Sequence, residues 1–160
     1  SGETTVGKYP SECVEVMNRI IRSVEANADR KLNDALKLKT PKELMLKSAV
    51  YLSDEISRCA IAVFTRRGNL ARTLSTLRPR NSPIFAFTES EAVFQNLLIY
   101  WGIEPFLMQF DKEDPEKTVQ RAFARLKSRG WVEPRDNMVM ISSVFAGSKV
   151  IDSIQLREIP

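Results

Sequence analysis

The hydrophobic residues follow two patterns that alternate along the sequence. Four short stretches are apolar at nearly every position, and they span residues 60–64, 83–88, 104–110 and 137–142. Runs this short predict strands, because a helix packed by one face would show a three- to four-residue repeat over a longer stretch. The first run is apolar throughout and is followed at once by Thr65, Arg66, Arg67 and Gly68, so it predicts a central strand that ends in a polar loop.

Between and before these runs, apolar residues recur every three or four positions, as in helices that bury one face. Pro10 suits the first position of such a helix, and Thr40 with Glu43 has the spacing of a capping box. Thr88 with Glu91 repeats that spacing. The predicted helices begin at Pro10, span 40–56, 68–77 and 90–100, and run from Asp114–Pro115 to Gly130. Their expected apolar faces are Cys13, Met17, Ile20, Ile21 and Val24 in the first, Met45, Ala49, Leu52 and Ile56 in the second, and Val119, Ala122, Phe123 and Leu126 in the last.

Three strand–helix units in a row predict a parallel sheet with helices on both faces. Residues 152–159 alternate apolar and polar positions, which predicts a fifth strand with one wet face. The loop expected over 143–151 is too short for a helical crossover, so this strand should run antiparallel to the fourth. The predicted fold class is therefore α/β: a three-layer sandwich with a mostly parallel five-stranded sheet, an antiparallel last strand, helices on both faces, and an N-terminal helical arm.

The chain divides into two predicted parts, 1–39 and 40–160. Residues 1–8 are polar and lack a start methionine, so we expect a loop taken from a longer chain. The polar stretch 26–39 contains only scattered leucines, which favours a linker or a loosely docked piece.

The composition changes this picture little, because 43% hydrophobic and 28% charged residues are ordinary for a globular domain of 160 residues. No apolar run is long enough for a membrane span and no signal peptide is recognisable, so a cytoplasmic location without membrane contact is expected. Cys13 and Cys59 have neither zinc-site spacing nor disulfide density, and both are expected to be buried thiols. Histidine is absent, which removes the commonest general base and metal ligand.

The charge distribution points to one region of the chain. The net charge is only +4, but no acidic residue lies between Glu55 and Glu89. Six arginines fall in that window: Arg58, Arg66, Arg67, Arg72, Arg78 and Arg80. An anionic partner is therefore expected to bind there.

The loop 65–69 is the candidate site within that window. It joins a predicted central strand to a helix, whose first N–H groups are unpaired and carry the positive end of the helix dipole. Gly68 allows close approach of the backbone, Thr65 and Asn69 offer hydrogen bonds, and Arg66 and Arg67 can bind phosphate oxygens. The alternative is an ordinary turn with solvated arginines. Because Thr88 and the loop around Gly147 lie at the same predicted sheet edge, Ser148 and Lys149 complete the candidate phosphate-binding set.

Two groups of residues make the chain resemble pyruvate kinase. The first resembles the last barrel loop and following helix of that family, which has the pattern SGETA-x-G-x-YP-x-E-x-V: Ser1, Gly2, Glu3, Thr4, Gly7, Tyr9, Pro10, Glu12, Val14, Met17 and Ile20. The second resembles its C-terminal domain: Thr65, Gly68, Ala71, Arg78, Pro79, Ile84, Ala86, Thr88, Gly102 and Pro105. The resemblance covers the whole chain.

This resemblance implies a regulatory and oligomerisation domain that is not catalytic by itself. In the family, the active site, with its magnesium and potassium ions, belongs to a barrel that precedes such a sequence, so no cofactor is expected in these residues. The loop matching 65–69 binds the phosphate of an allosteric effector, often a sugar bisphosphate or a nucleotide. The implied partners are such an effector, the barrel domain and further copies of the chain.

The chain also departs from the family pattern. Arg67 stands where the family has serine, and Asn69 with Leu70 replaces its hydroxyl-bearing stretch. The closing loop VFAGSKVID has only Gly147 where the family is glycine-rich. A phosphate, a nucleotide or a monophosphorylated sugar is therefore as good a candidate as fructose bisphosphate.

Other functions stay open at this point. A stand-alone phosphate- or nucleotide-binding module without a barrel is the main alternative, and the sequence upstream of Ser1 would separate it from a kinase domain. Nucleic-acid binding by the arginines is weakened by the mild net charge and the lack of a known motif. An independent enzyme is weakened by the lack of histidine, of a metal cluster and of a nucleophile motif.

Overall fold

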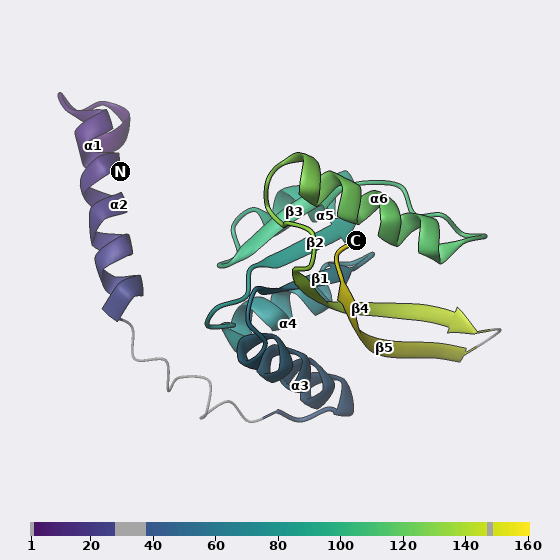
Figure 1. Cartoon of the computed structure of the whole chain (residues 1–160). Coiled ribbons are helices and arrows are strands. Elements are labelled where there is room, and N and C mark those ends of the chain that lie inside the picture. The colour runs from purple at the N-terminus through teal and green to yellow at the C-terminus, as the bar shows by residue number, and fades with distance from the viewer. Residues whose placement is uncertain (1, 28–37, 147–148) are drawn as a thin grey trace. The chain divides into compact units, whose positions relative to one another are not determined.

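A computed structural model describes residues 2–27, 38–146 and 149–160, in two compact units, Ser1–Ala35 and Leu36–Pro160 (Figure 1). The expected linker 26–39 lies largely outside the described residues. The boundary predicted after residue 39 stays a prediction.

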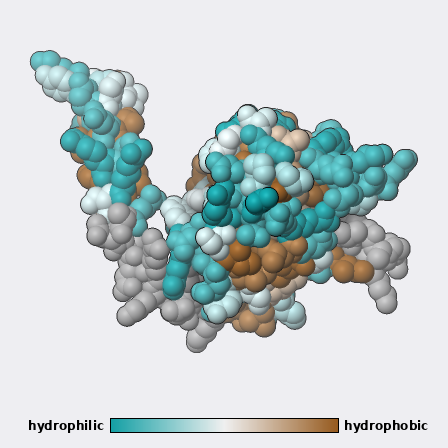
Figure 2. Space-filling view, viewed as in Figure 1, coloured by the Kyte–Doolittle hydropathy of each residue, from teal (hydrophilic) through white to brown (hydrophobic). Residues whose placement is uncertain are grey.

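The first unit consists of a short helix α1 (Gly2–Thr5) and the long helix α2 (Pro10–Asn27). Residues 2–5 are helical, so the prediction of a loop over 1–8 is wrong there. The apolar face predicted for α2 is exposed: Met17, Ile20, Ile21 and Val24 are 46–62% exposed, and Figure 2 shows brown apolar atoms along this helix. Cys13 is half-buried, which corrects its expected burial, whereas Cys59 is buried; both are free thiols.

The second unit is built on one five-stranded sheet with the order β3-β2-β1-β4-β5. Its strands are β1 (Cys59–Phe64), β2 (Ile84–Thr88), β3 (Ile103–Leu107), β4 (Asn137–Ala146) and β5 (Lys149–Glu158). β1 pairs in parallel with both β2 and β4, and β2 with β3, whereas β5 runs antiparallel to β4. The predicted topology is therefore confirmed, with β1 as the central strand.

Helices cover both faces of this sheet, as predicted. α3 (Pro41–Glu55), α4 (Asn69–Leu77) and α5 (Glu91–Leu97) contribute to one core with Ile61 and Val63 of β1. α6 (Pro115–Ser128) packs on the opposite face against Ala60 and Ala62. Alternate residues of β1 thus serve two cores, which explains why the strand is apolar at every position.

The second core contains a connected series of aromatic rings. Phe64 stacks on Phe87 at 5.1 Å between ring centroids, and Phe87 stacks on Phe106 at 5.2 Å. Phe106 meets Phe85 edge-on at 6.2 Å, and Phe85 meets Trp131 at 5.7 Å. Burial of each of the three fully buried rings, Phe85, Phe87 and Phe106, contributes about 1.5–3 kcal/mol to folding. The series runs from the last residue of β1 to Trp131, which follows α6.

The helix starts confirm two capping predictions and correct a third. Thr40 and Glu43 form the predicted capping box of α3, and Asp114 caps α6. The cap of α5 is Ser90, whose side chain accepts from the N–H of Val93, and not Thr88, which is the last residue of β2. Since Thr88 continues the apolar strand pairing, the strand takes precedence over the capping spacing.

Several element boundaries also differ from the prediction. The largest difference is the expected loop 143–151, most of which is strand, since β4 and β5 pair up to Ala146 and Lys149. Ser142 and Ser143 break the apolar pattern, but Ser143 donates to Asp152 across the strands at 2.5 Å. The third strand ends at Leu107 and α5 ends at Leu97, earlier than predicted. In α3 the buried face is centred on Leu46, Ala49 and Val50, with Met45, Leu52 and Ile56 only partly buried.

An ionic cluster joins the amino ends of β1 and β4. Arg58 donates from Nε to Asp136 and from Nη2 to Glu133, both at 2.6 Å, and its carbonyl accepts from the N–H of Asn137 at 2.9 Å. Asp136 also accepts from the N–H of Glu133 at 2.7 Å. This N–H, together with Arg58, holds the pKa of Asp136 below its ordinary value of 3.8.

We expect this cluster to make the free energy of unfolding depend on pH in the acidic range. A carboxyl group whose pKa is lowered by folding stabilises the protein above its unfolded pKa, and this contribution is lost as the pH falls through the folded value. Urea unfolding should therefore show less loss of stability from about pH 6 to about pH 3 for Asp136→Asn than for the wild type. Glu158→Gln is the control and should follow the wild type. Equal losses for Asp136→Asn and wild type would contradict this assignment.

Candidate functional site

The loop after β1 is held by hydrogen bonds to the sheet and to itself. Thr65 is buried, and its N–H donates to the carbonyl of Phe87 at 2.9 Å. Its Oγ1 accepts from the N–H of Gly68 at 3.0 Å. The Thr65 hydroxyl therefore fixes the turn and keeps only its own proton to donate to a ligand.

Gly68 caps α4 in the left-handed region, with φ +78°. A Cβ at this position would lie 3.3 Å from Cγ1 of Val93, because the loop packs against α5. No side chain caps the amino end of α4, and its first turn contains no acidic residue. The first N–H groups of α4 and the positive end of its dipole are thus available to an anion.

Arg66 and Arg67 are both exposed beside this helix end. Asn69, predicted to offer its side chain to a ligand, instead accepts a hydrogen bond from Nη2 of Arg72. This contact brings a third guanidinium group to the first turn of α4. Sequence reasoning placed Arg72 in the arginine window but gave it no role; its position three residues after Asn69 on a helix was the available signal.

The other two predicted residues are not brought to the site by the described structure. Ser148 lies outside the described residues, and Lys149 starts β5 with a side chain that is not described. Their assignment stays a prediction. The edge itself fits a site: β1 and β4 are neighbours, yet the segment after β1 leads into α4 while β4 pairs onward with β5. Ligands of open α/β sheets bind where such connections separate.

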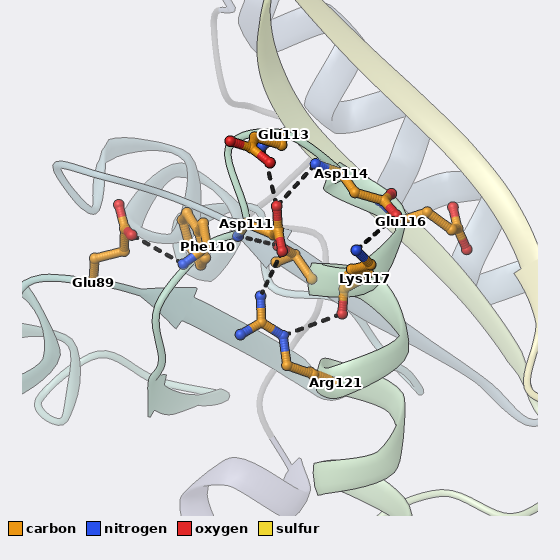
Figure 3. Close-up of polar contacts among 9 residues, drawn as sticks. Glu89, Phe110, Asp111, Glu113, Asp114, Glu116, Lys117 and Arg121 are labelled. Atoms are coloured by element: carbon orange, nitrogen blue, oxygen red, sulfur yellow. Dashed lines mark hydrogen bonds and ion pairs between the residues drawn. The ribbon is translucent and has the colours of Figure 1, made fainter.

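A second loop, residues 108–114, called the acidic loop below, follows β3 and lies at the same edge as the loop 65–69, because β1, β2 and β3 run parallel. Figure 3 shows its polar contacts. Oδ1 of Asp111 accepts from the N–H groups of Glu113 and Asp114 at 3.1 and 2.9 Å, and Glu89 accepts from the N–H of Phe110 at 2.9 Å. The N–H of Asp114 is the main cause that lowers the pKa of Asp111. The ring of Phe110 meets that of Phe64 at 5.7 Å, so this loop reaches the end of β1. Sequence reasoning missed this loop.

Comparison with known proteins shows the family of this chain. The profile of the pyruvate kinase alpha/beta domain matches residues 43–155. The chain belongs to the pyruvate kinase family.

Similar proteins from this family extend the match to the whole chain. Pyruvate kinase isozyme A, chloroplastic, from Ricinus communis is 29% identical over 100% of this chain, and a pyruvate kinase from Staphylococcus epidermidis is 33% identical over 93% of it. The structure of Cryptosporidium parvum pyruvate kinase in complex with ADP superimposes with a TM-score of 0.79 at 26% identity, over 100% of this chain. The chain spans 28%, 26% and 33% of these proteins, respectively.

The described residues contain no group of three or more His, Cys, Asp or Glu residues placed to hold a metal ion. Within the same residues, no helix has both the length and the apolar character to cross a membrane.

Gly68 gives a test of the loop geometry. We expect Gly68→Ala to lower the free energy of unfolding by about 1–2 kcal/mol, because alanine is strained at positive φ and its Cβ would crowd Val93. Gly102→Ala is the matched control, since Gly102 also has positive φ, +70°, but a Cβ there meets nothing within 4 Å. Urea unfolding measures both variants. A Gly68→Ala variant no less stable than Gly102→Ala would argue against the close packing of the loop.

Proposed function

We propose that this pyruvate kinase C-terminal domain is regulatory and binds a phosphorylated small-molecule effector at the loop 65–69. The observation that carries the proposal is the uncapped, acid-free amino end of α4 with Arg66 and Arg67 exposed beside it. A phosphate group accepts hydrogen bonds from helix N–H groups and from guanidinium groups at the same time. The loop thus supplies both the geometry and the charge that a phosphate needs.

The phosphate contacts are expected to come from a small set of groups. The N–H groups of the first turn of α4 bind the oxygens along the helix axis, and Arg66 and Arg67 bind from the exposed side. The Thr65 hydroxyl donates its remaining proton. Arg72 adds charge through its contact with Asn69. Ser148 and Lys149 are proposed to complete the site from the β4–β5 end.

The chemistry of the kinase is proposed to lie outside these residues. Phosphoryl transfer from phosphoenolpyruvate to ADP, with its magnesium and potassium ions, is assigned to the barrel domain, and this chain alone is expected to form no pyruvate in a coupled turnover assay. Metal-dependent pyruvate formation would refute this.

A stand-alone binding module is disfavoured because the similarity to whole kinases begins before the matched domain. The cytoplasmic location stays a prediction, since relatives include chloroplastic enzymes.

The exposed face of α2 is proposed to be a contact surface for the barrel domain and for further copies in an oligomer. Four apolar side chains on one face of this helix are 46–62% exposed. A contiguous exposed apolar patch of this kind is typical of a surface that contacts another protein or domain. In a preparation of residues 1–160 alone, a second copy can occupy this face.

The arginines of the loop provide the test of effector binding. Replacing both, Arg66→Ala with Arg67→Ala, should weaken binding of a phosphorylated sugar by about 1–3 kcal/mol, or about 5- to 150-fold in Kd, because charge-assisted contacts are strong but partly screened at an exposed site. Titration calorimetry measures the loss. Arg80→Ala with Arg135→Ala removes two exposed arginines that precede β2 and β4, at the opposite edge, and should leave Kd unchanged. Equal effects of the two double variants would place the site elsewhere.

The α2 face gives a second test. We expect light scattering to show the wild-type chain as a dimer or larger species, and Ile20→Gln with Ile21→Gln to shift it to the monomer, since two half-exposed isoleucines are lost from the contact. Val6→Gln removes an exposed apolar residue outside α2 and is the control. A wild-type chain that is monomeric at all concentrations would rule out this contact.

A further inference from the structure

We infer that the carboxyl edge of the sheet selects a ligand with a single phosphate group, and that Glu89 and Asp111 are the residues that reject a second one. The inference rests on the proposed function, since it concerns the far end of a ligand whose phosphate is bound by the loop 65–69. The ligand is a phosphomonoester whose non-phosphate part carries hydroxyl groups.

The structure fixes where the two carboxylates lie. Glu89 directly follows Thr88, the last residue of β2, which pairs with β1. Asp111 follows Phe110, whose ring lies 5.7 Å from that of Phe64, the residue before Thr65. Both carboxylates therefore belong to segments that touch the end of β1, where the phosphate is proposed to bind.

Both side chains are held in place by backbone N–H groups. Glu89 accepts from Phe110, and Asp111 accepts from Glu113 and Asp114 (Figure 3). Two cations act on Asp111: Nη2 of Arg121 is 3.9 Å from its Oδ2, a long ion pair, and Lys117 also lowers its pKa electrostatically. None of the ion pairs found among the described residues includes Glu89. Glu89 is therefore the carboxylate at this end of the edge whose negative charge has no ion-pair partner among the described residues.

The spacing of the strands makes this charge relevant to a sugar bisphosphate. Neighbouring strands lie about 4.8 Å apart, so the ends of β1 and β3 are separated by about 10 Å. Exposed charges about 10 Å apart are largely screened at physiological ionic strength, where the Debye length is about 8 Å, so the two carboxylates act on a second phosphate that comes close to them and not on the first phosphate. A second phosphate on the same sugar would approach the two carboxylates, whereas a hydroxyl group there can donate to them.

On the other side of β1 the charge is already balanced. Asp152 of β5 pairs with Lys42 at 2.9 Å and accepts from Ser143. The preference for a ligand with one phosphate group over a ligand with two is therefore assigned to the β2–β3 side of the edge. A ligand that extended over β4 and β5 instead would not respond to changes at Glu89 and Asp111.

The test compares fructose 6-phosphate with fructose 1,6-bisphosphate, which differ by one phosphate group. Titration calorimetry on the whole chain should show that the wild type binds the monophosphate at least about tenfold more tightly. The variant Glu89→Gln with Asp111→Asn keeps an oxygen that can accept from each N–H group but removes both charges. It should tighten binding of the bisphosphate about tenfold and leave the monophosphate within about twofold.

The control is Glu55→Gln with Glu158→Gln, which changes the net charge equally at the opposite edge, where α3 ends and β5 ends. It should leave the ratio of the two Kd values as in the wild type, and circular dichroism should show both variants folded. A wild type that prefers the bisphosphate, or an unchanged ratio in the Glu89/Asp111 variant, would overturn the inference and leave effector binding intact. If neither sugar phosphate binds to the wild type, the proposed function fails as well.

Discussion

The parallel pairing of β1 with both β2 and β4 is the constraint on which the rest of the structure depends. A strand in this position is covered on both faces, so each of its side chains belongs to one of two cores. Its direction also places the loop 65–69, the loop after β2 and the loop after β3 at one edge of the sheet. The fold thus creates a shared edge first, and the side chains of three separate loops then set its charge.

The sequence allowed the architecture to be predicted because the strongest signals come from the buried strands. The all-apolar run at 60–64 is too short for a helix and predicts a covered strand, and a short connection before residues 152–159 predicts an antiparallel return. The ends of strands were harder to predict where a polar residue lies within a strand or an apolar residue lies just beyond its end. Ser143 remains in β4 because its hydroxyl donates a hydrogen bond to Asp152 across the hairpin. No local sequence pattern reveals this partner. Thr88 remains in β2 because its backbone pairs with the neighbouring strand β3, which is also a long-range contact.

The candidate site was predictable in its position but not in its detail. A strand, a glycine and a helix start point to the loop, and Gly68 has the positive φ that such a turn needs. The roles of side chains depend on contacts that spacing leaves open: Thr65 accepts from Gly68, and Asn69 accepts from Arg72. The acidic loop could not be found at all from local patterns, since Phe110 and Phe64 are 46 residues apart in sequence and meet only in the folded sheet.

The aromatic series gives the two edges of the sheet a mechanical connection. Phe64 precedes the loop 65–69 and touches Phe110 of the acidic loop, while Phe85 contacts Trp131 at the amino edge. Protein interiors are packed as densely as organic crystals, so a ring in such a series cannot rotate or shift without displacing its neighbour. A change in the loop that moved Phe64 would have to be accommodated ring by ring through Phe87, Phe106 and Phe85. The series is therefore a continuous path of ring contacts from the end of β1 to Trp131, a ring that is 46% exposed.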